Sequence, residues 1–230
     1  MSLTLYYHPL ASFCWKALIA LYENDTPFEP HMVDLGDAAA RAAFHKLWPM
    51  GKMPVLRDDA RDQTIPEATI VIEYLAQHYP GRTELVPADP DRARQMRLAD
   101  RIYDSYVHEP MQKIVTDRIR PVGKGDPHGV ELAKAQILSA YDMIEEEMAA
   151  KRWPVGDEFT LADCSACPAL FYADTVVPFG EGHKRLSAYL DRLMVRPSFA
   201  RVLGEAEPYF KLFPMDKKPR VARTGTKAGS

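Results

Sequence analysis

The chain has 230 residues, of which 47% are hydrophobic and 27% charged, and its formal net charge at pH 7 is -3. Because single domains most often hold about 100 to 150 residues, this length predicts two small domains with separate cores. The weak net charge supplies no basic field to collect phosphates, which argues against nucleic acid and favours a small-molecule substrate. No apolar run of membrane-spanning length and no signal peptide occurs, so we expect a cytoplasmic protein without membrane contact.

The first 50 residues carry the pattern of a βαβ unit and a helical connection. Residues 3–7 alternate as a strand does, and the period changes to that of a helix from Ser12 to residues 24–25. A second strand is expected over residues 28–33, and an alanine-rich helix over residues 38–43.

The next 30 residues predict a β-hairpin and a helix. A third strand begins after Met53-Pro54, the charged residues at 57–61 suit the hairpin tip, and residues 63–66 form a fourth strand. Glu67 opens a helix, where an acidic side chain suits the positive end of the dipole, and residues 80–81 end it.

The second half is predicted to be helical. A proline-containing linker over residues 81–90 leads into helices over residues 91–213, and Pro110 is expected to end or kink the first long helix. Residues 160–163 resemble a capping box with aspartate as its acid. The basic tail over residues 214–230 has few apolar residues and is predicted to be disordered.

The three cysteines are too few for a disulfide framework and are expected to be thiols. Cys14 lies on the apolar face of the first helix, which favours a buried position. Cys164 and Cys167 form a C-x-x-C pattern, but the pattern follows a helix start in the second half. We therefore expect both thiols to face a core and to have no redox or metal role.

Four short motifs follow one another along the chain. They are Tyr-His-Pro-Leu-Ala-Ser at 7–12, Gly-Lys-Met-Pro-Val-Leu at 51–56, Glu-Ala-Thr-Ile-Val-Ile-Glu-Tyr-Leu at 67–75, and Val-Gly-Asp-Glu-Phe-Thr-Leu-Ala-Asp at 155–163 with Pro168 after it. Together they resemble the motifs of cytosolic glutathione S-transferases, nearest to bacterial classes related to theta, zeta and beta. The resemblance covers residues 3–213.

The resemblance implies a thioredoxin-like α/β domain over residues 1–80, a linker over 81–90 and an all-α domain over 91–213. It also implies an enzyme of detoxification that conjugates reduced glutathione to hydrophobic electrophiles, works as a homodimer and needs no metal. Three alternatives stay open: a non-catalytic glutathione-binding or interaction module of the same fold, a glutathione-dependent isomerase, and a thiol-disulfide reductase acting through Cys14.

The resemblance implies two candidates for contact with the glutathione thiolate. Ser12 occupies the position of the theta-class serine, at a helix start whose dipole also lowers a thiol pKa. An alternative for Ser12 is a purely structural N-cap. Tyr7 corresponds to the tyrosine of the alpha, mu and pi classes, with a core strand position as its alternative.

Other motif residues are implied to bind glutathione. Pro54 is expected to be cis, so that the backbone of Met53 pairs with the cysteinyl unit, while Lys52 meets the glycine carboxylate. Glu67 would take the γ-glutamyl ammonium and the Ala68 amide its carboxylate.

Two further expectations concern this ligand. Ala68 stands where the family has serine, so Thr69 is a substitute candidate for the missing hydroxyl. Asp100 or Asp104 is implied to reach the γ-glutamyl ammonium bound by the partner subunit, with a solvated helix face as the alternative.

The electrophile is expected between the two domains. Aromatic and apolar side chains at helical spacing are the candidates, although such stripes are often core. The predicted pocket is lined by Leu10, Tyr103, Tyr106 and Met111, with Phe210 or Phe213 as covers.

Overall fold

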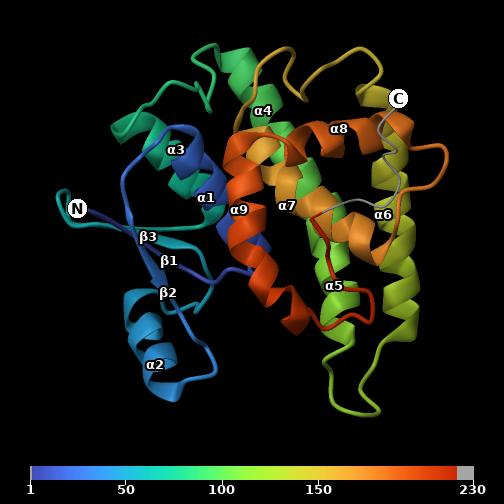
Figure 1. Cartoon of the computed structure of the whole chain (residues 1–230), viewed down its shortest axis with the longest axis horizontal. Helices are drawn as coiled ribbons and strands as arrows, with labels where there is room; N and C mark the ends of the chain where they lie inside the picture. Colours follow the sequence, from blue (N-terminus) through green and yellow to red (C-terminus); the bar gives the residue numbers. More distant parts are fainter. Residues whose placement is uncertain (1, 222–230) are drawn as a thin grey trace.

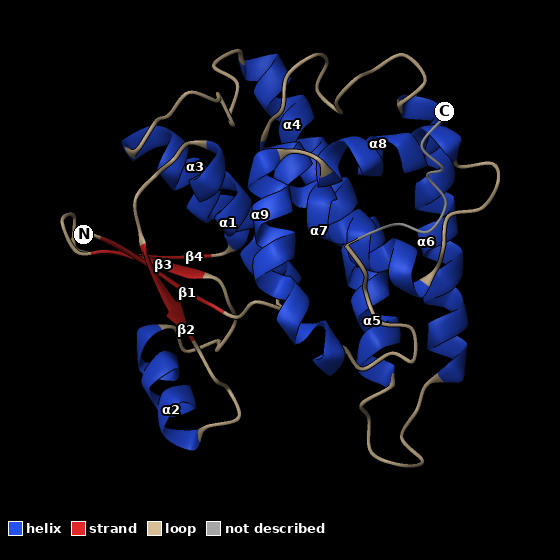
Figure 2. Cartoon of the chain, in the orientation of Figure 1, coloured by secondary structure: helices blue, strands red, loops and turns tan. Residues whose placement is uncertain are grey.

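The fold is taken from a computed structural model that describes residues 2–221. The first domain contains a four-stranded sheet in the order β2-β1-β3-β4 (Figure 2). Its strands are β1 (Leu3–Tyr7), β2 (Glu29–Met32), β3 (Val55–Asp58) and β4 (Gln63–Pro66). Strand β1 pairs parallel with β2 and antiparallel with β3, and β3 pairs antiparallel with β4. The βαβ and hairpin predictions are confirmed, and the architecture is thioredoxin-like.

Helices cover both faces of the sheet (Figure 1). Helices α1 (Ser12–Glu23) and α3 (Ala68–His78) pack together on one face. Helix α2 (Ala38–Leu47) lies on the other, where Phe44 forms a small core with Val33 and Val55. The alternation of β1 explains the two layers, because Leu3 and Leu5 join the large core while Tyr6 packs against the small one.

The second domain is helical. Its elements are α4 (Pro90–Ile102), the π-helical turn η1 (Tyr103–His108), α5 (Glu109–Asp117), α6 (Pro127–Glu147), α7 (Leu161–Val176), α8 (Lys184–Met194), α9 (Pro197–Ala206) and the 3-10 turn η2 (Glu207–Leu212). The capping box before α7 is present, because Thr160 and Asp163 exchange both bonds.

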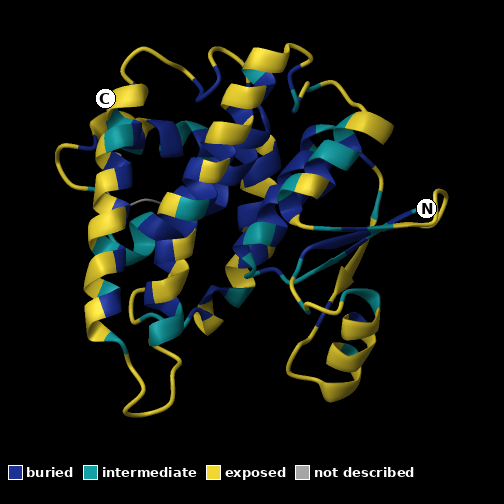
Figure 3. Cartoon of the chain, turned by 180° about the vertical axis from the view of Figure 1, so that it is seen from behind, coloured by how far each residue is buried: buried dark blue, intermediate teal, exposed yellow. Residues whose placement is uncertain are grey.

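Helix α1 joins the two domains. It packs on α3 of its own domain and on α7 and α9 of the second, and its residues 14–21 are all buried (Figure 3). A helix enclosed on all sides is normally apolar all round. Lys16 departs from that rule, since its side chain is only 1% exposed.

The prediction that Pro110 would end the long helix was wrong, but an irregular turn does lie directly before it. The backbone passes from α4 through η1 into α5 and continues to Asp117, with Pro110 in the first turn of α5. Inside a continuous helix, proline lacks the N–H that would bond to the preceding turn, and its ring clashes with a carbonyl of that turn. The irregularity lies earlier, in η1, and π-helical turns occur often at functional sites.

The segments that flank the second domain are held against it. The chain between α3 and α4 is fixed where the Leu161 amide donates to Leu85 O at 2.8 Å and the Thr83 amide to Asn24 Oδ1 at 2.8 Å. The disorder predicted for 214–230 does not hold for residues 214–221, because Met215 and Val221 pack against the core. Residues 222–230 lie outside the described part of the chain.

Candidate functional site

The strand register brings three motifs to one edge of the sheet. Tyr6, near the end of β1, lies opposite Val55 at the start of β3, and Val55 lies opposite Pro66 at the end of β4. The segments that continue from this edge are residues 8–11 leading into α1, the Met53-Pro54 bond before β3, and Glu67 at the start of α3. We call this set the sheet-edge site. It brings together the starts of two helices, where backbone N–H groups without intrahelical partners favour anions.

Ser12 is the first residue of α1, and its hydroxyl does not cap the helix. Ala11 is the N-cap residue, without a side-chain bond. The Ser12 Oγ instead lies in hydrogen-bond contact with Nε2 of His108, the last residue of η1. The structural alternative predicted for Ser12, an N-cap, is therefore wrong, and its side chain is free of any backbone capping bond.

Tyr7 ends β1 and is half-buried against the large core. Burial raises the pKa of its phenol, and the charge of Glu205 and the neighbouring Tyr209 raise it further. Those two residues belong to α9 and η2, whereas Ser12 contacts η1. Tyr7 and Ser12 therefore face different elements of the second domain, and they are separate candidates for contact with a thiolate.

The motif at residues 51–56 contains a cis peptide bond and an exposed lysine. The Met53-Pro54 bond is cis, as the resemblance implied. Pro54 is buried and Met53 packs partly against the small core behind the sheet. Lys52 is exposed, and its ammonium has no hydrogen-bond or ion-pair partner within residues 2–221.

Glu67 has the most unusual backbone at the sheet-edge site. It is the N-cap of α3, with φ 69° and ψ 118°. A non-glycine residue at positive φ outside the left-handed helical region costs about 1 to 3 kcal/mol, and such residues cluster at functional sites. The Glu67 side chain is exposed and makes no capping bond. Its carboxylate also has no cationic partner among the described residues.

Thr69, the second residue of α3, has its hydroxyl bonded to residues of other elements. The hydroxyl accepts from Lys16 Nζ at 3.1 Å and lies 3.0 Å from Asp100 Oδ2. Lys16 also binds Asp100 Oδ1 and Asp104 Oδ2, both at 2.8 Å. Arg101 closes this group with 2.7 Å contacts to the same two carboxylates. Thr69 therefore belongs to an ion network between the domains, and its role as a substitute for the missing serine hydroxyl stays a prediction.

The same network corrects the prediction for Asp100 and Asp104. Their exposed fractions are 1% and 6%, and both carboxylates bind Lys16 of their own chain. Neither lies on a solvated face, and both carboxylates are paired within their own chain. Burial alone would raise the pKa of Asp100, but the Lys16 ammonium and hydrogen bonds from Ser165 and Arg101 outweigh it and lower that pKa.

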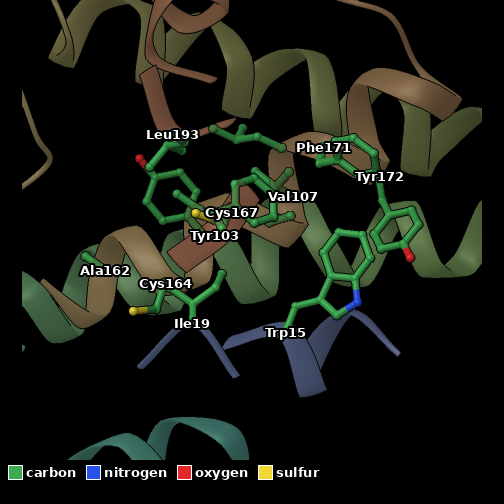
Figure 4. Packing of buried hydrophobic residues seen from close by; sticks show 14 of the residues in the cluster. Trp15, Ile19, Tyr103, Val107, Ala162, Cys164, Cys167, Phe171, Tyr172 and Leu193 are labelled. Atoms are coloured by element: carbon green, nitrogen blue, oxygen red, sulfur yellow. The ribbon is translucent and has the colours of Figure 1, made fainter. Parts of the chain in front are cut away.

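The three cysteines lie in the core, as predicted. All are unpaired thiols with 0% exposure, and Figure 4 shows Cys164 and Cys167 packed beside Ile19 and Tyr103. Burial raises the pKa of Cys14 to about 12, against a lowering hydrogen bond from the His8 backbone. A thiol of this kind holds almost no thiolate at neutral pH, which argues against the reductase alternative.

The predicted electrophile pocket is only partly supported by side-chain positions. Tyr103 and Met111 are each 3% exposed and belong to the large core, so they do not line an accessible surface. Figure 4 shows Tyr103 among the core residues. Leu10 is half-buried and Tyr106 is 51% exposed, so both stay candidates. The two predicted covers are also core residues: Phe210 lies beside Trp15 and Phe171, and Phe213 stacks on Tyr172.

A hollow of about 690 Å³ lies elsewhere, in the second domain. It is bordered by the end of α7, the first part of α8 and residues 217–220, and by none of the sheet-edge residues. Within residues 2–221, no cluster of three or more potential metal-ligating side chains forms. No helix in this part of the chain has the length and apolarity needed to cross a membrane.

Sequence reasoning missed Lys16 and His108. The signal was present in their spacing, because Ser12 and Lys16 are four residues apart, as are Asp100, Asp104 and His108. Residues four apart share a helix face. Two polar faces of equal spacing can contact each other directly, and the structure pairs Ser12 with His108 and Lys16 with Asp104.

Comparison with known proteins gives consistent matches. The N-terminal and C-terminal domain models of glutathione S-transferase match residues 5–83 and 127–192. A glutathione S-transferase-like protein LUC7 of Fusarium is 31% identical over 148 residues, 64% of each chain. A stringent starvation protein A homolog of Haemophilus influenzae is 29% identical over 215 residues, covering 90% of this chain and 92% of the relative.

The fold is also found among solved structures. A glutathione S-transferase of Methylobacillus flagellatus, crystallised with glutathione, superposes with a TM-score of 0.80 at 22% identity over 87% of this chain and 98% of that one. The two domain models together match more than half of the chain, in the order in which the two domains are folded. The chain therefore belongs to the glutathione S-transferase family.

Proposed function

We propose that the chain binds reduced glutathione at the sheet-edge site and conjugates its sulfur to hydrophobic electrophiles. The observation that carries the proposal is Glu67, an exposed carboxylate without a partner in the described chain, held in a strained backbone at the start of α3. Strain of this kind persists where the surrounding structure enforces it, and often where a ligand needs the side chain.

The charges of glutathione complement this site. The tripeptide carries one ammonium and two carboxylates at neutral pH. Glu67 offers a carboxylate for the ammonium, and the first amides of α3, including that of Ala68, offer N–H groups for the neighbouring carboxylate. Lys52, which precedes β3, would bind the carboxylate at the glycine end, and the Met53 backbone would pair with the cysteinyl unit.

The chemistry requires a thiolate. A free thiol has a pKa of roughly 8.5, so only a few per cent is ionised at neutral pH. In the proposed reaction the thiol proton leaves for solvent and Ser12 donates a hydrogen bond to the sulfur anion. The sulfur then forms a bond to an electrophilic carbon, and the leaving group departs with its electron pair. The start of α1 stabilises the anion through its dipole. Leu10 and Tyr106 would contact the electrophile.

We also propose that the active form is a homodimer. Ile70 on α3 and Leu98 on α4 are 51% and 59% exposed, and large exposed apolar side chains on neighbouring helices favour a protein contact. Sedimentation at micromolar concentration should give about twice the 26.0 kDa mass of one chain. A monomer would remove this part of the proposal and leave glutathione binding untouched.

A second candidate is a non-catalytic module of the same fold. Two observations favour it: Ala68 lacks the hydroxyl of the family serine, and one relative is a stringent starvation protein A homolog. A module of this kind would require neither thiolate stabilisation nor turnover.

Retention on immobilised glutathione, followed by conjugation to a generic aromatic electrophile, separates the two candidates. The proposed enzyme should be retained, be eluted by free glutathione and show turnover. Retention without turnover would favour a glutathione-binding module. Absence of retention would contradict the proposed enzyme and favour an interaction module that does not bind glutathione.

Ser12→Ala then tests the catalytic role. Loss of a hydrogen bond to an anion, worth about 1.5 to 3 kcal/mol, should raise the pKa of the bound glutathione thiol by about 1 to 2 units. The ultraviolet absorbance of the thiolate, titrated against pH, measures this value. Superimposable titrations of the two proteins would contradict the role of Ser12, and Tyr7→Phe would then be the next substitution.

A further inference from the structure

The contact between Ser12 and His108 joins the predicted thiolate donor to the second domain. Their exposed fractions are 8% and 2%. The hydroxyl oxygen contacts Nε2 of the imidazole, and the Phe13 ring lies edge-on to the imidazole with centroids 4.2 Å apart. Within the described chain, the other ring nitrogen, Nδ1, is buried and has no hydrogen-bond partner.

The position of His108 is fixed by a second pair one helical turn away. Lys16 lies four residues after Ser12 on α1, and Asp104 lies four residues before His108 in η1. Lys16 Nζ binds Asp104 Oδ2 at 2.8 Å. The two segments therefore meet in opposite directions at two points, and the ion pair holds the imidazole against the Ser12 hydroxyl.

The unpartnered Nδ1 indicates which ring nitrogen carries hydrogen. A buried N–H group without an acceptor is rare and costly, more so than an acceptor without a donor. Hydrogen on Nδ1 would create such an orphan donor, whereas hydrogen on Nε2 is directed at the Ser12 oxygen. The favoured form is thus the Nε2–H tautomer, in which His108 donates and Ser12 accepts.

We propose that His108 is a positioning residue that donates Nε2–H to Ser12 and so directs the Ser12 hydroxyl hydrogen toward the sulfur of bound glutathione. The inference rests on the proposed function. A hydroxyl group that accepts one hydrogen bond becomes a stronger donor of the next, because successive bonds polarise each other. Without His108 the hydroxyl could rotate toward other acceptors, and its bond to the thiolate would weaken.

The pair does not act as a serine nucleophile with its base. In that arrangement a carboxylate orients the base through its Nδ1–H, and here the Nδ1 atom has no such partner. Burial, together with the smaller effect of the Lys16 charge, lowers the pKa of His108 to about 3. The imidazole is therefore neutral, and too weak a base to remove a serine proton.

The test compares His108→Phe and His108→Gln in the full chain. Phenylalanine keeps the ring but removes the donor, so the pKa of the bound glutathione thiol should rise by about 0.5 to 1 unit, part of the Ser12 contribution. Glutamine keeps an N–H donor at similar reach and should restore most of the wild-type value. A pKa unchanged by phenylalanine, or raised equally by glutamine, would overturn the proposal.

His183→Phe is the matched control for destabilisation. His183 is 9% exposed and bonds to Asp142 Oδ1 at 2.9 Å and to the Gly180 amide at 3.1 Å, away from the sheet-edge site. It should lower the melting temperature as His108→Phe does, without moving the thiol pKa. An equal rise in the control would show that the effect reports lost stability and would overturn the proposal.

A double substitution separates failure of this inference from failure of the proposed function. If His108 acts only through Ser12, the thiol pKa of Ser12→Ala/His108→Phe should equal that of Ser12→Ala alone. If Ser12→Ala leaves the thiol pKa unchanged, Ser12 has no catalytic role. An effect of Ser12→Ala with none of His108→Phe removes only the role of His108.

Nitrogen-15 chemical shifts of the imidazole in the unsubstituted protein give an independent reading that needs no stable variant. The expected result is a neutral ring with hydrogen on Nε2 at neutral pH. A ring with hydrogen on Nδ1 would overturn the proposal even if none of the His108 variants folds.

Discussion

Two lysines of the first domain, Lys16 and Lys52, show opposite solutions for a positive charge. Lys16 is 1% exposed and binds two carboxylates and a hydroxyl, so all its hydrogen-bond donors are paired within the chain. Lys52 is exposed beside the sheet-edge site and has no partner in the described chain. A charge that is fully paired inside a protein serves architecture, whereas a charge left unpaired at a strained edge is available to a ligand. The same contrast separates Asp104 from Glu67.

The largest effect on stability is expected from removing the buried charge of Lys16. Lys16→Met leaves Asp100 and Asp104 buried with only Arg101 as a cation, and removal of one partner of a buried pair costs about 3 to 5 kcal/mol. Chemical denaturation should show this loss of unfolding free energy. Combining Lys16→Met with Asp100→Asn and Asp104→Asn should recover part of it, because no unpaired buried charge remains. A loss under about 1 kcal/mol would show that Lys16 is solvated in solution.

Substitution of the exposed Glu67 should change glutathione affinity and leave stability unchanged. Glu67→Gln removes the charge for the γ-glutamyl ammonium and should weaken glutathione binding by about 1.5 to 3 kcal/mol, with an unchanged melting temperature. Calorimetric titration measures the affinity. Equal affinities of the two proteins would mean that Glu67 is only a favourable charge at a helix start.

The far end of α1 carries a second buried carboxylate between the domains, and its contribution depends on pH. Glu23 is 5% exposed and accepts from Arg196 Nε at 2.9 Å and Ser198 Oγ at 2.7 Å. Burial alone would raise its pKa, but Arg196 and Ser198 outweigh burial and lower it. A carboxyl whose folded-state pKa is lowered stabilises the fold above its unfolded pKa of about 4.3, and that contribution is lost as the pH falls.

Glu23→Gln should therefore cost about 1 to 3 kcal/mol at pH 7. The curves of unfolding free energy for the two proteins should converge below about pH 4. Parallel curves down to acid pH would mean that the Glu23 contribution is one of packing and not of charge.

The sequence predicted the fold more fully than the site. Period and turn residues defined the strands and most helices, because these depend on neighbours along the chain. Tyr103 and Met111 were assigned to a pocket because an apolar helical face has the same sequence pattern whether it borders a pocket or a core. The ion network of Lys16 and the pairing of Ser12 with His108 depend on contact between distant helices. Only the equal spacing of their polar residues hinted at that contact.

The smallest effect is expected for Lys52, since an exposed ion pair is worth about 0.2 to 1 kcal/mol. Lys52→Ala should weaken glutathione binding by at most about fivefold, and the difference should shrink as salt is added, because screening acts strongly on exposed charges. Lys46→Ala is the control, since it removes the same charge from an exposed position on α2 of the same domain. If both variants lose affinity equally, Lys52 acts through the net charge of the domain and not through contact. If only Lys52→Ala loses affinity, and its affinity stays below that of the unsubstituted protein at high salt, the lysine forms a bond to glutathione that is shielded from solvent. Both lysines would then form shielded bonds, Lys16 within the chain and Lys52 with the ligand.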